Sequence, residues 1–359
     1  SKFLVKSIYH IMKNSFHKSL LLVLVPIVLL SCKKDDDDDS GSGFTEGVFI
    51  VNEGNYLGNN ASISFVDDDD FITKDPYSTV NGSTVGDVLQ SFVHTGDRGY
   101  AVVNGSQKVI AIDMNSFSRV AEFTDLEYPR YAAVYGTNDL LITDGFTSGK
   151  LVVMDRTTYQ ATHVINVGSG PERLFTAANR VFVLNAASTT VSVIDPSTWS
   201  VVYTIALSDH PSDMVVDAQG DLWILCSGET LYDANWNIIG HTDAQIHHVN
   251  GGTLEWVESW IVGTNGQHPR DLERSPNGQV LYYAGDQLMK FDVASGPSNA
   301  EVMVSNAFYG ITVDANSGDV WAVLPSDYLN PSTIHRYSST GSLEKTFQAG
   351  MVSNAVVLR

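Results

Sequence analysis

Side chains able to bind a ligand recur in two series of loops along this chain. One series surrounds the dipeptides Tyr128-Pro129, Gly170-Pro171, His210-Pro211 and His268-Pro269, and the other follows β-rich segments and is rich in Asn, Gly and aromatics. Aromatic rings bury area on ligand rings, while amides and guanidinium groups supply directed hydrogen bonds. The candidate contacts are Gln90, Arg130, Arg173, Asp213, Arg270, Tyr309 and Asn354 in the first series, and Tyr56, Asn59, Phe146, Tyr232, Trp236 and Tyr328 in the second.

Catalytic and metal-binding spacings are absent from the sequence. There is no His-Glu-x-x-His, no Gly-x-Ser-x-Gly and no cysteine cluster. The run Asp67–Asp70 lacks calcium-loop spacing and is expected to form a solvated turn. His247 and His248 are adjacent on an expected strand, so they face opposite sides, and Cys226 is expected to be a buried thiol. We predict no catalytic residue, no metal and no cofactor; a catalytic site of dispersed residues stays open.

Composition excludes one class of partner. Without residues 1–31 the chain loses four Lys, which leaves 17 Lys and Arg against 41 Asp and Glu, a net charge of −24. Nucleic-acid binding needs a basic face, so a nucleic-acid partner is not expected. Hydrophobic residues make up 43% of the chain, which is ample for a core.

The elements that position these loops repeat about every 42 residues. An apolar residue followed by Asp, Asn or Ser ends a strand seven times, in four copies as the second of an apolar pair, and the last residues lie 46, 42, 40, 55, 42 and 46 positions apart. The seven copies end at Asp67, Asp113, Asp155, Asp195, Asn250, Asp292 and Ser338. A fixed period of this length is typical of repeat architectures, in which one unit cannot bury its apolar face alone.

Four short strands fit within each repeat. A β-rich strand about ten residues before each apolar pair ends in a polar turn, as in Phe182–Asn185, and another strand follows the pair, as in Val201–Ile205. Tight turns rich in Gly, Asn and Asp separate them. Seven units of four strands predict an all-β, seven-bladed β-propeller over residues 47–359. The two loop series then share one face and ring the mouth of the central channel.

The repeat also resembles a known family. Val191–Thr198 and Val167–Pro171 are its best matches to the YVTN or YncE-like propeller repeat, in which a strand, Val-x-Val-Ile-Asp and a Val-Gly-x-x-Pro loop follow one another. This resemblance implies the same fold. It implies no particular function.

The chain ends indicate how the ring closes. Gly47–Asn52 matches the second strand of a blade, and Asn354–Leu358 matches a first strand such as Asp213–Val216. We therefore predict that the C-terminal strand completes the N-terminal blade.

The N-terminal segment resembles an export signal. Four Lys precede the apolar run Leu20–Leu30, which is too short to span a bilayer. The run ends in Leu29-Leu30-Ser31-Cys32, which resembles a bacterial lipobox and implies a signal peptide over 1–31 with lipidation at Cys32. An ordinary signal peptide with an incidental Cys is the alternative. The sequence opens on Ser1, and Met12 is a more natural start.

Residues 32–46 form an expected tether. Asp35–Asp39 repel one another, and the following Gly and Ser add flexibility. The acidic run also resembles the segment behind the lipidated Cys in surface lipoproteins of Bacteroidetes, which implies an outer-membrane protein facing the cell surface. The alternative is a tether that carries no surface-targeting signal, on a periplasmic protein.

A second resemblance bears on function. The opening Gly47–Asn55 and the later Asn59–Ile63 resemble the signature of Bacteroidetes surface propellers. That family includes lipoproteins that capture cobalamin (vitamin B12) and pass it to a TonB-dependent outer-membrane transporter. The resemblance implies a surface lipoprotein that binds cobalamin or a related corrinoid. A glycan-active extracellular enzyme, and a scaffold for protein interaction or a surface layer, are the alternatives.

Overall fold

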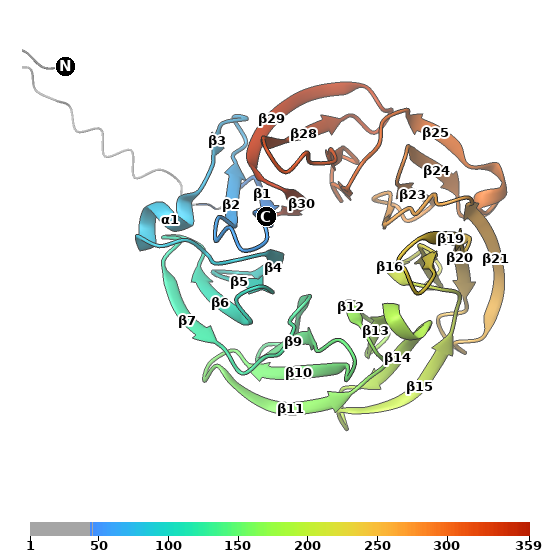
Figure 1. Cartoon of the computed structure of the whole chain (residues 1–359), viewed down its shortest axis with the longest axis horizontal. Helices are drawn as coiled ribbons and strands as arrows, with labels where there is room; N and C mark the ends of the chain where they lie inside the picture. Colours follow the sequence, from blue (N-terminus) through green and yellow to red (C-terminus); the bar gives the residue numbers. More distant parts are fainter. Residues whose placement is uncertain (1–43, 45) are drawn as a thin grey trace, which may run out of the picture. The chain divides into compact units, whose positions relative to one another are not determined.

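The computed structural model describes Phe44 and residues 46–359. The predicted signal peptide, its start at Met12, Cys32 and the Asp35–Asp39 run lie outside the described residues. The described strands form seven four-stranded antiparallel sheets, arranged as blades around a central channel (Figure 1). This confirms the predicted all-β, seven-bladed β-propeller.

The four strands of each blade lie side by side from the channel outward. From the innermost strand, the first blade holds β30(Ser353–Leu358), β1(Val48–Asn52), β2(Ser62–Val66) and β3(Ile72–Thr73). The short helix α1(Pro76–Asn81) leads to the second blade. The second and third blades hold β4(Leu89–Thr95), β5(Arg98–Val103), β6(Lys108–Asp113), β7(Arg119–Phe123), then β8(Ala132–Tyr135), β9(Asp139–Asp144), β10(Lys150–Asp155) and β11(Gln160–Asn166).

The remaining blades follow the same order. The fourth holds β12(Pro171–Ala177), β13(Arg180–Asn185), β14(Thr190–Asp195) and β15(Ser200–Ala206), with the 3-10 turn η1(Ala186–Ser188). The fifth holds β16(Pro211–Val216), β17(Leu222–Cys226), β20(Ala244–Val249) and β21(Trp256–Gly263). The sixth and seventh hold β22(Asp271–Arg274), β23(Val280–Ala284), β24(Leu288–Asp292), β25(Glu301–Val304), then β26(Gly310–Val313), β27(Val320–Val323), β28(Pro331–Tyr337) and β29(Leu343–Met351), with η2(Pro297–Asn299) between β24 and β25.

The fifth blade carries an insertion, in the repeat where 55 residues separate Asp195 and Asn250. A separate two-stranded hairpin, β18(Thr230–Tyr232) and β19(Ile238–His241), stands between β17 and β20. No helix among the described residues is long and apolar enough to span a membrane.

The hydrophobic core lies between the blades. The described residues form seven apolar clusters, and each draws its members from two neighbouring blades. Phe49 of the first blade, for example, packs against Phe92 of the second. Since neighbouring sheets cover both faces of a blade, its second strand is largely buried, and all five residues of β1 and of β17 are buried. On the outer strands β11 and β15, only Ile165 and Ile205 are buried.

The ring closes as the chain ends predict. Strand β30 pairs antiparallel with β1, from Val48 opposite Leu358 to Asn52 opposite Ser353. In Figure 1 the last strand lies beside the first, at the inner edge of the same blade. The N-terminal blade is therefore completed by the C-terminal strand.

Asn52 is buried at the centre of this closure. Its Nδ2 donates to Ser62 Oγ at 3.1 Å and Ser64 Oγ at 3.0 Å, and its Oδ1 accepts from Gly350 N at 3.1 Å and Ser353 Oγ at 2.6 Å. One side chain thus links β1, β2, β29 and β30. A buried amide with all these partners satisfied stabilises one register of the closing strand.

One predicted turn has more structure than expected. In the Asp67–Asp70 run, Asp70 forms an ion pair with Arg336 Nη1 at 2.7 Å and another with Lys345 Nζ at 3.0 Å. These contacts cross from the first blade to the seventh. The end of the run is therefore a second inter-blade contact at the closure and not only a solvated turn.

Deleting residues 352–359 should destabilise the whole ring, because β1 and the cluster around Val356 would lose their partner strand.

Val356→Asp should cost about 3 kcal/mol or more of unfolding free energy, because it places a charge in that cluster. Denaturant unfolding measures both variants. Leu343→Asp, on the exposed outer strand β29, is the control and should unfold like the wild type. A deletion variant as stable as the intact protein would contradict the closure.

Candidate ligand-binding site at the channel mouth

A left-handed residue stands before the innermost strand of four blades. Val88, Gly170, His210 and Val352 have φ of 55°, 58°, 59° and 52°, and each immediately precedes the first residue of β4, β12, β16 or β30. In all four of these blades the strand register shifts directly afterwards. Such bulges re-aim side chains at a strand end, here at the channel. Two valines in this conformation are strained, because β-branched residues avoid positive φ.

A cavity of about 1290 Å³ runs from the channel mouth along the innermost strands, as far as Val93, Phe175 and Leu358. Small-molecule pockets usually measure ~300–1,000 Å³, so a bulky ligand fits. Nine of the predicted contacts line it: Tyr56, Gln90, Arg130, Arg173, Tyr232, Arg270, Tyr309, Tyr328 and Asn354.

The other four predicted contacts do not line this cavity. Asp213 is buried and bonded to Arg173, while Asn59 is an exposed loop residue with a left-handed φ of 47°. Phe146 is exposed, with its ring 6.3 Å from that of Tyr128. Trp236 is 81% exposed in the turn of the β18–β19 hairpin. The sequence predicts all four near the mouth. In the structure, none of the four lines the cavity.

Arg130 is held by two neighbours in the cavity wall. Its Nε donates to both carboxylate oxygens of Glu172, at 2.9 and 3.0 Å, and its Nη1 donates to Gln90 Oε1 at 2.6 Å. Burial lowers the pKa of Arg130, but the attraction of Glu172 outweighs it and the net pKa is raised. Three blades thereby meet through one guanidinium, and Glu172 balances its charge.

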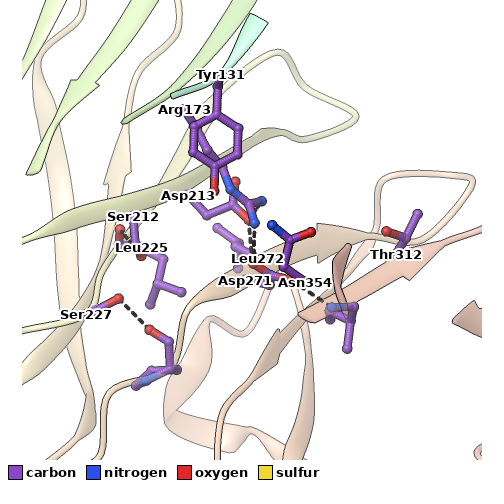
Figure 2. Close-up of polar contacts among 12 residues, drawn as sticks. Tyr131, Arg173, Ser212, Asp213, Leu225, Ser227, Asp271, Leu272, Thr312 and Asn354 are labelled. Carbon is purple, nitrogen blue, oxygen red and sulfur yellow. Dashed lines mark hydrogen bonds and ion pairs between the residues drawn. The ribbon is translucent and has the colours of Figure 1, made fainter. Parts of the chain in front are cut away.

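Arg173 forms a second cross-link, shown in Figure 2. It reaches from the fourth blade to Asp213 of the fifth, at 2.7 Å, and to Asp271 of the sixth. Asp213 also accepts from Leu272 N at 2.8 Å, and Asp271 accepts from Ile311 N at 2.7 Å in the seventh blade. Arg173 therefore lines the cavity, but its charge is paired with Asp213 and Asp271. Through these two carboxylates it helps to connect four blades.

Carboxyl groups gather deep in the channel around this cross-link. Burial raises the pKa of Asp213 to about 6, although Arg173 opposes the rise. Glu273 lines the cavity as well, and burial together with the charges of Asp213 and Asp271 raises its pKa well above the ordinary value. Protons therefore bind here more readily than on solvent-exposed carboxylates.

Asn354 presents an unused acceptor at the cavity wall. Its Nδ2 donates to Glu53 Oε1 at 2.9 Å and to Gln90 O at 2.8 Å. Its Oδ1 is buried and has no hydrogen-bond partner among residues 46–359. Burial raises the pKa of Glu53, against the hydrogen bond from Asn354. Less than 1 Å² of this oxygen is accessible, so a ligand amide N–H would reach it only after a shift of the side chain or of its neighbours.

Arg270 differs from the other two cavity arginines. Its guanidinium lies over the ring of Tyr309, 5.1 Å from the centroid, and has no hydrogen bond or ion pair with any described residue. Burial raises the pKa of Tyr309 to about 12, so its hydroxyl stays protonated at neutral pH. This pair offers a ring, a hydroxyl and free N–H donors on one wall.

Two histidines of the cavity escaped the sequence prediction of contacts. His268 Nδ1 lies 2.7 Å from Ser227 O and must donate there, because a carbonyl oxygen only accepts. His210 also lines the cavity, and burial, followed by the charges of Arg270 and His268, lowers its pKa. Each histidine precedes the Pro of an inter-blade loop. This position in the sequence could have identified both as cavity residues.

Exposed aromatics surround the opening. Tyr56 is 77% exposed, and Tyr128, Tyr232 and Tyr328 are exposed as well. The loops of Tyr56 and Tyr328 are tied together, since Asn55 Nδ2 donates to Tyr328 O at 2.8 Å. The rings thus stand on loops that hydrogen bonds hold in place.

Polar residues at the ends of second strands have a structural role. Asn104 Nδ2 donates to Pro129 O at 3.0 Å, and Asp144 accepts from Tyr128 N at 2.6 Å. Ser227 Oγ donates to Pro269 O. These residues anchor the inter-blade loops that carry the cavity side chains.

Other reactive groups sit away from the cavity. Cys226 is buried, as predicted, and burial raises its pKa to about 12. His247 bonds to Ser208 Oγ and His248 to Asp221, so they face opposite sides as predicted. Asp217, Asp221 and His248 place ligand atoms within 4.8 Å of one another. Asp217 uses both carboxylate oxygens on backbone N–H groups and on Trp223 Nε1, so this cluster has a structural role.

A family model matches most of the propeller. Residues 46–351 match the family described as "Domain of unknown function (DUF5074)". The chain belongs to the DUF5074 family. No curated protein matches it.

Solved structures share the fold of this DUF5074 member at low identity. A quinonprotein alcohol dehydrogenase-like protein from Bacteroides thetaiotaomicron is 14% identical, with a TM-score of 0.66 over 89% of this chain and 79% of that one. The hydrazine synthase of Kuenenia stuttgartiensis is 12% identical, with a TM-score of 0.60 over 80% and 89%. A functionally unknown protein from Desulfotomaculum acetoxidans is 10% identical, with a TM-score of 0.64 over 88% and 99%. At these identities the likeness concerns the fold alone.

Arg173→Met should destabilise the DUF5074 propeller by about 3–5 kcal/mol at neutral pH, because it leaves two buried carboxylates unpaired. In the wild type, Asp213 titrates near 6 when folded and near 3.8 when unfolded, so stability falls as pH rises between these values. Losing Arg173 should raise the folded pKa further and extend this fall above pH 6. Denaturant unfolding from pH 4 to 8 measures it, with Arg274→Met, exposed on β22, as control. A pH-independent loss would indicate a packing defect instead.

Proposed function

We propose that this protein captures a bulky, ring-containing small molecule at the channel mouth. One observation carries the proposal: a cavity of about 1290 Å³ is ringed by exposed tyrosines on anchored loops and lined by polar groups. Apolar rings with a few directed polar groups are the usual make-up of a ligand site. The free Oδ1 of Asn354 and the stacked Arg270 supply an acceptor and donors in the same wall.

We propose cobalamin or a related corrinoid as the ligand. A corrinoid is large, flat and rimmed by amides, which suits a wide mouth with aromatic rings and side-chain acceptors. The resemblance of Gly47–Ile63 to cobalamin-capturing surface lipoproteins supports this choice. The cavity size is consistent with it.

We further propose that the propeller is held at the outer-membrane surface and delivers its ligand to a TonB-dependent transporter. Support comes from the Leu29–Cys32 lipobox and the acidic Asp35–Asp39 run. Export before folding and a lipid anchor would place the ring in contact with extracellular nutrients. The glycan-active enzyme and the interaction scaffold remain the alternatives that the binding test separates.

Purified protein should bind cobalamin with a dissociation constant at or below the micromolar range, seen by calorimetry or by a shift in the visible spectrum. Tyr56→Ala and Tyr328→Ala should each weaken binding by about tenfold, because each removes ring contact of about 1–1.5 kcal/mol. Leu343→Ala, on the far outer strand, is the matched control. Absence of binding at micromolar protein would overturn the corrinoid proposal, and turnover of a polysaccharide would favour the enzyme.

Cys32→Ser should release the protein from the membrane fraction, because a lipid chain supplies its anchor. Replacing Asp35–Asp39 with Asn should leave the anchor but reduce cleavage by protease added to whole cells, if the acidic run directs surface exposure. Fractionation and immunoblotting measure both. A wild-type protein that stays protected from protease in intact cells would rule out the surface location.

A further inference from the structure

The three arginines that line the cavity differ in how their charge is used. Arg130 is bonded to Glu172 and Gln90, and Arg173 is bonded to Asp213 and Asp271. Arg270 has no such partner in the part of the chain that the structure describes. Among the described residues, one cavity cation is therefore left without a bonded counter-charge.

Tyr309 fixes the orientation of this cation. Its ring lies 5.1 Å from the guanidinium carbon of Arg270 and packs on the apolar cluster between the seventh and first blades. Its backbone N donates to Val323 O at 2.8 Å, and Arg270 N donates to Ala284 O at 2.9 Å. A guanidinium that is held over a ring and has no hydrogen-bond partner among the described residues keeps its N–H groups free, and two of them can bind two oxygens of one oxyanion.

One imidazole of the same cavity adds a donor. His210 and Arg270 both line the cavity, and burial, followed by the charge of Arg270, lowers the pKa of His210. The imidazole of His210 makes no hydrogen bond with any described residue. The Nδ1 of His268 donates to Ser227 O, and its Nε2 lies 3.2 Å from Thr230 Oγ1.

Five carboxylates line the cavity, those of Glu53, Glu172, Glu229, Asp271 and Glu273, and none of them forms an ion pair with Arg270. Glu172 is paired with Arg130, and Asp271 with Arg173. Glu53 feels the charge of Arg270 but bonds to Asn354, and burial raises its pKa. Arg270 is thus poised for an anion supplied from outside.

We propose that Arg270, with His210 in the same cavity, binds an oxyanion carried by the captured ligand, either a phosphate ester or a carboxylate. This deepens the proposed function and rests on it only for the choice of cavity. It predicts that the protein prefers ligands with an anionic arm next to the ring system. The neutral wall around Asn354 would bind the amide-bearing part.

The test compares ligands that differ in the anionic arm. Calorimetry on the full chain, solubilised with its anchor, measures cobalamin, which carries a phosphodiester, and cobinamide, which lacks the phosphate. Arg270→Gln should weaken cobalamin binding by about 10- to 100-fold and leave cobinamide within about twofold, since a charged hydrogen-bonded pair is lost for only one ligand. Arg270→Lys should fall between. Arg274→Gln makes the same charge change at the last residue of β22, the strand that Arg270 immediately precedes, and outside the cavity, so this variant should bind both ligands like the wild type.

The outcomes separate this inference from the proposed function. Equal loss for both corrinoids, or no loss for either, overturns the oxyanion site while corrinoid capture stands. If neither corrinoid binds the wild type, the corrinoid proposal fails, and inorganic phosphate and acetate, titrated separately by NMR, decide the inference. Binding of phosphate or of acetate that Arg270→Gln abolishes supports the site and tells the two sources apart. Binding of neither anion overturns it. An unchanged melting temperature of Arg270→Gln confirms that the variant folds.

Discussion

Pairing of β30 with β1 is the interaction on which the rest of this structure depends. Every other blade consists of four strands that are continuous in sequence, apart from the inserted hairpin, but the first blade joins the two ends of the propeller. Each blade buries its faces only against its neighbours, so an open ring would expose two apolar sheets. Asn52 fixes the register in which the two strands pair, because its four hydrogen bonds form in one register only.

The channel shows how a repeat protein divides its polar residues between structure and binding. Successive inner strands present charged side chains to one another, and burial makes unpaired charges costly. Arg130 and Arg173 resolve this by cross-linking carboxylates from neighbouring blades. The seventh blade has Tyr309 where others have charged or amide groups, and Arg270 stacks on it instead of forming an ion pair. The irregularity in the repeat is what leaves binding capacity at the mouth.

The sequence predicted which residues gather at the candidate site. It did not predict which of them are paired with each other and which are free to bind a ligand. Loop position alone brought Gln90, Arg130, Arg270, Tyr309 and Asn354 to one cavity, because the propeller topology puts these loops on one face. Arg173 and Asp213 share that position, yet they bond to each other. His210 and His268 have the right position but no distinctive spacing, since a histidine before a proline is not a recognisable ligand motif. The YncE-like and cobalamin resemblances stay predictions.

The sequence by itself determined the number of blades, the strand order and the closing strand, because the alternation of apolar strands and turns is local and repeats every 40-odd residues. Even the insertion at Thr230–His241 was visible as extra length in one repeat. Only the tertiary structure decided which polar side chains are free. Contacts such as Arg173 to Asp271 join residues 98 positions apart, and their distances depend on the radius and stagger of the closed ring. A local pattern carries no information on those quantities, so it could name the wall of the cavity but not the unpaired cation within it.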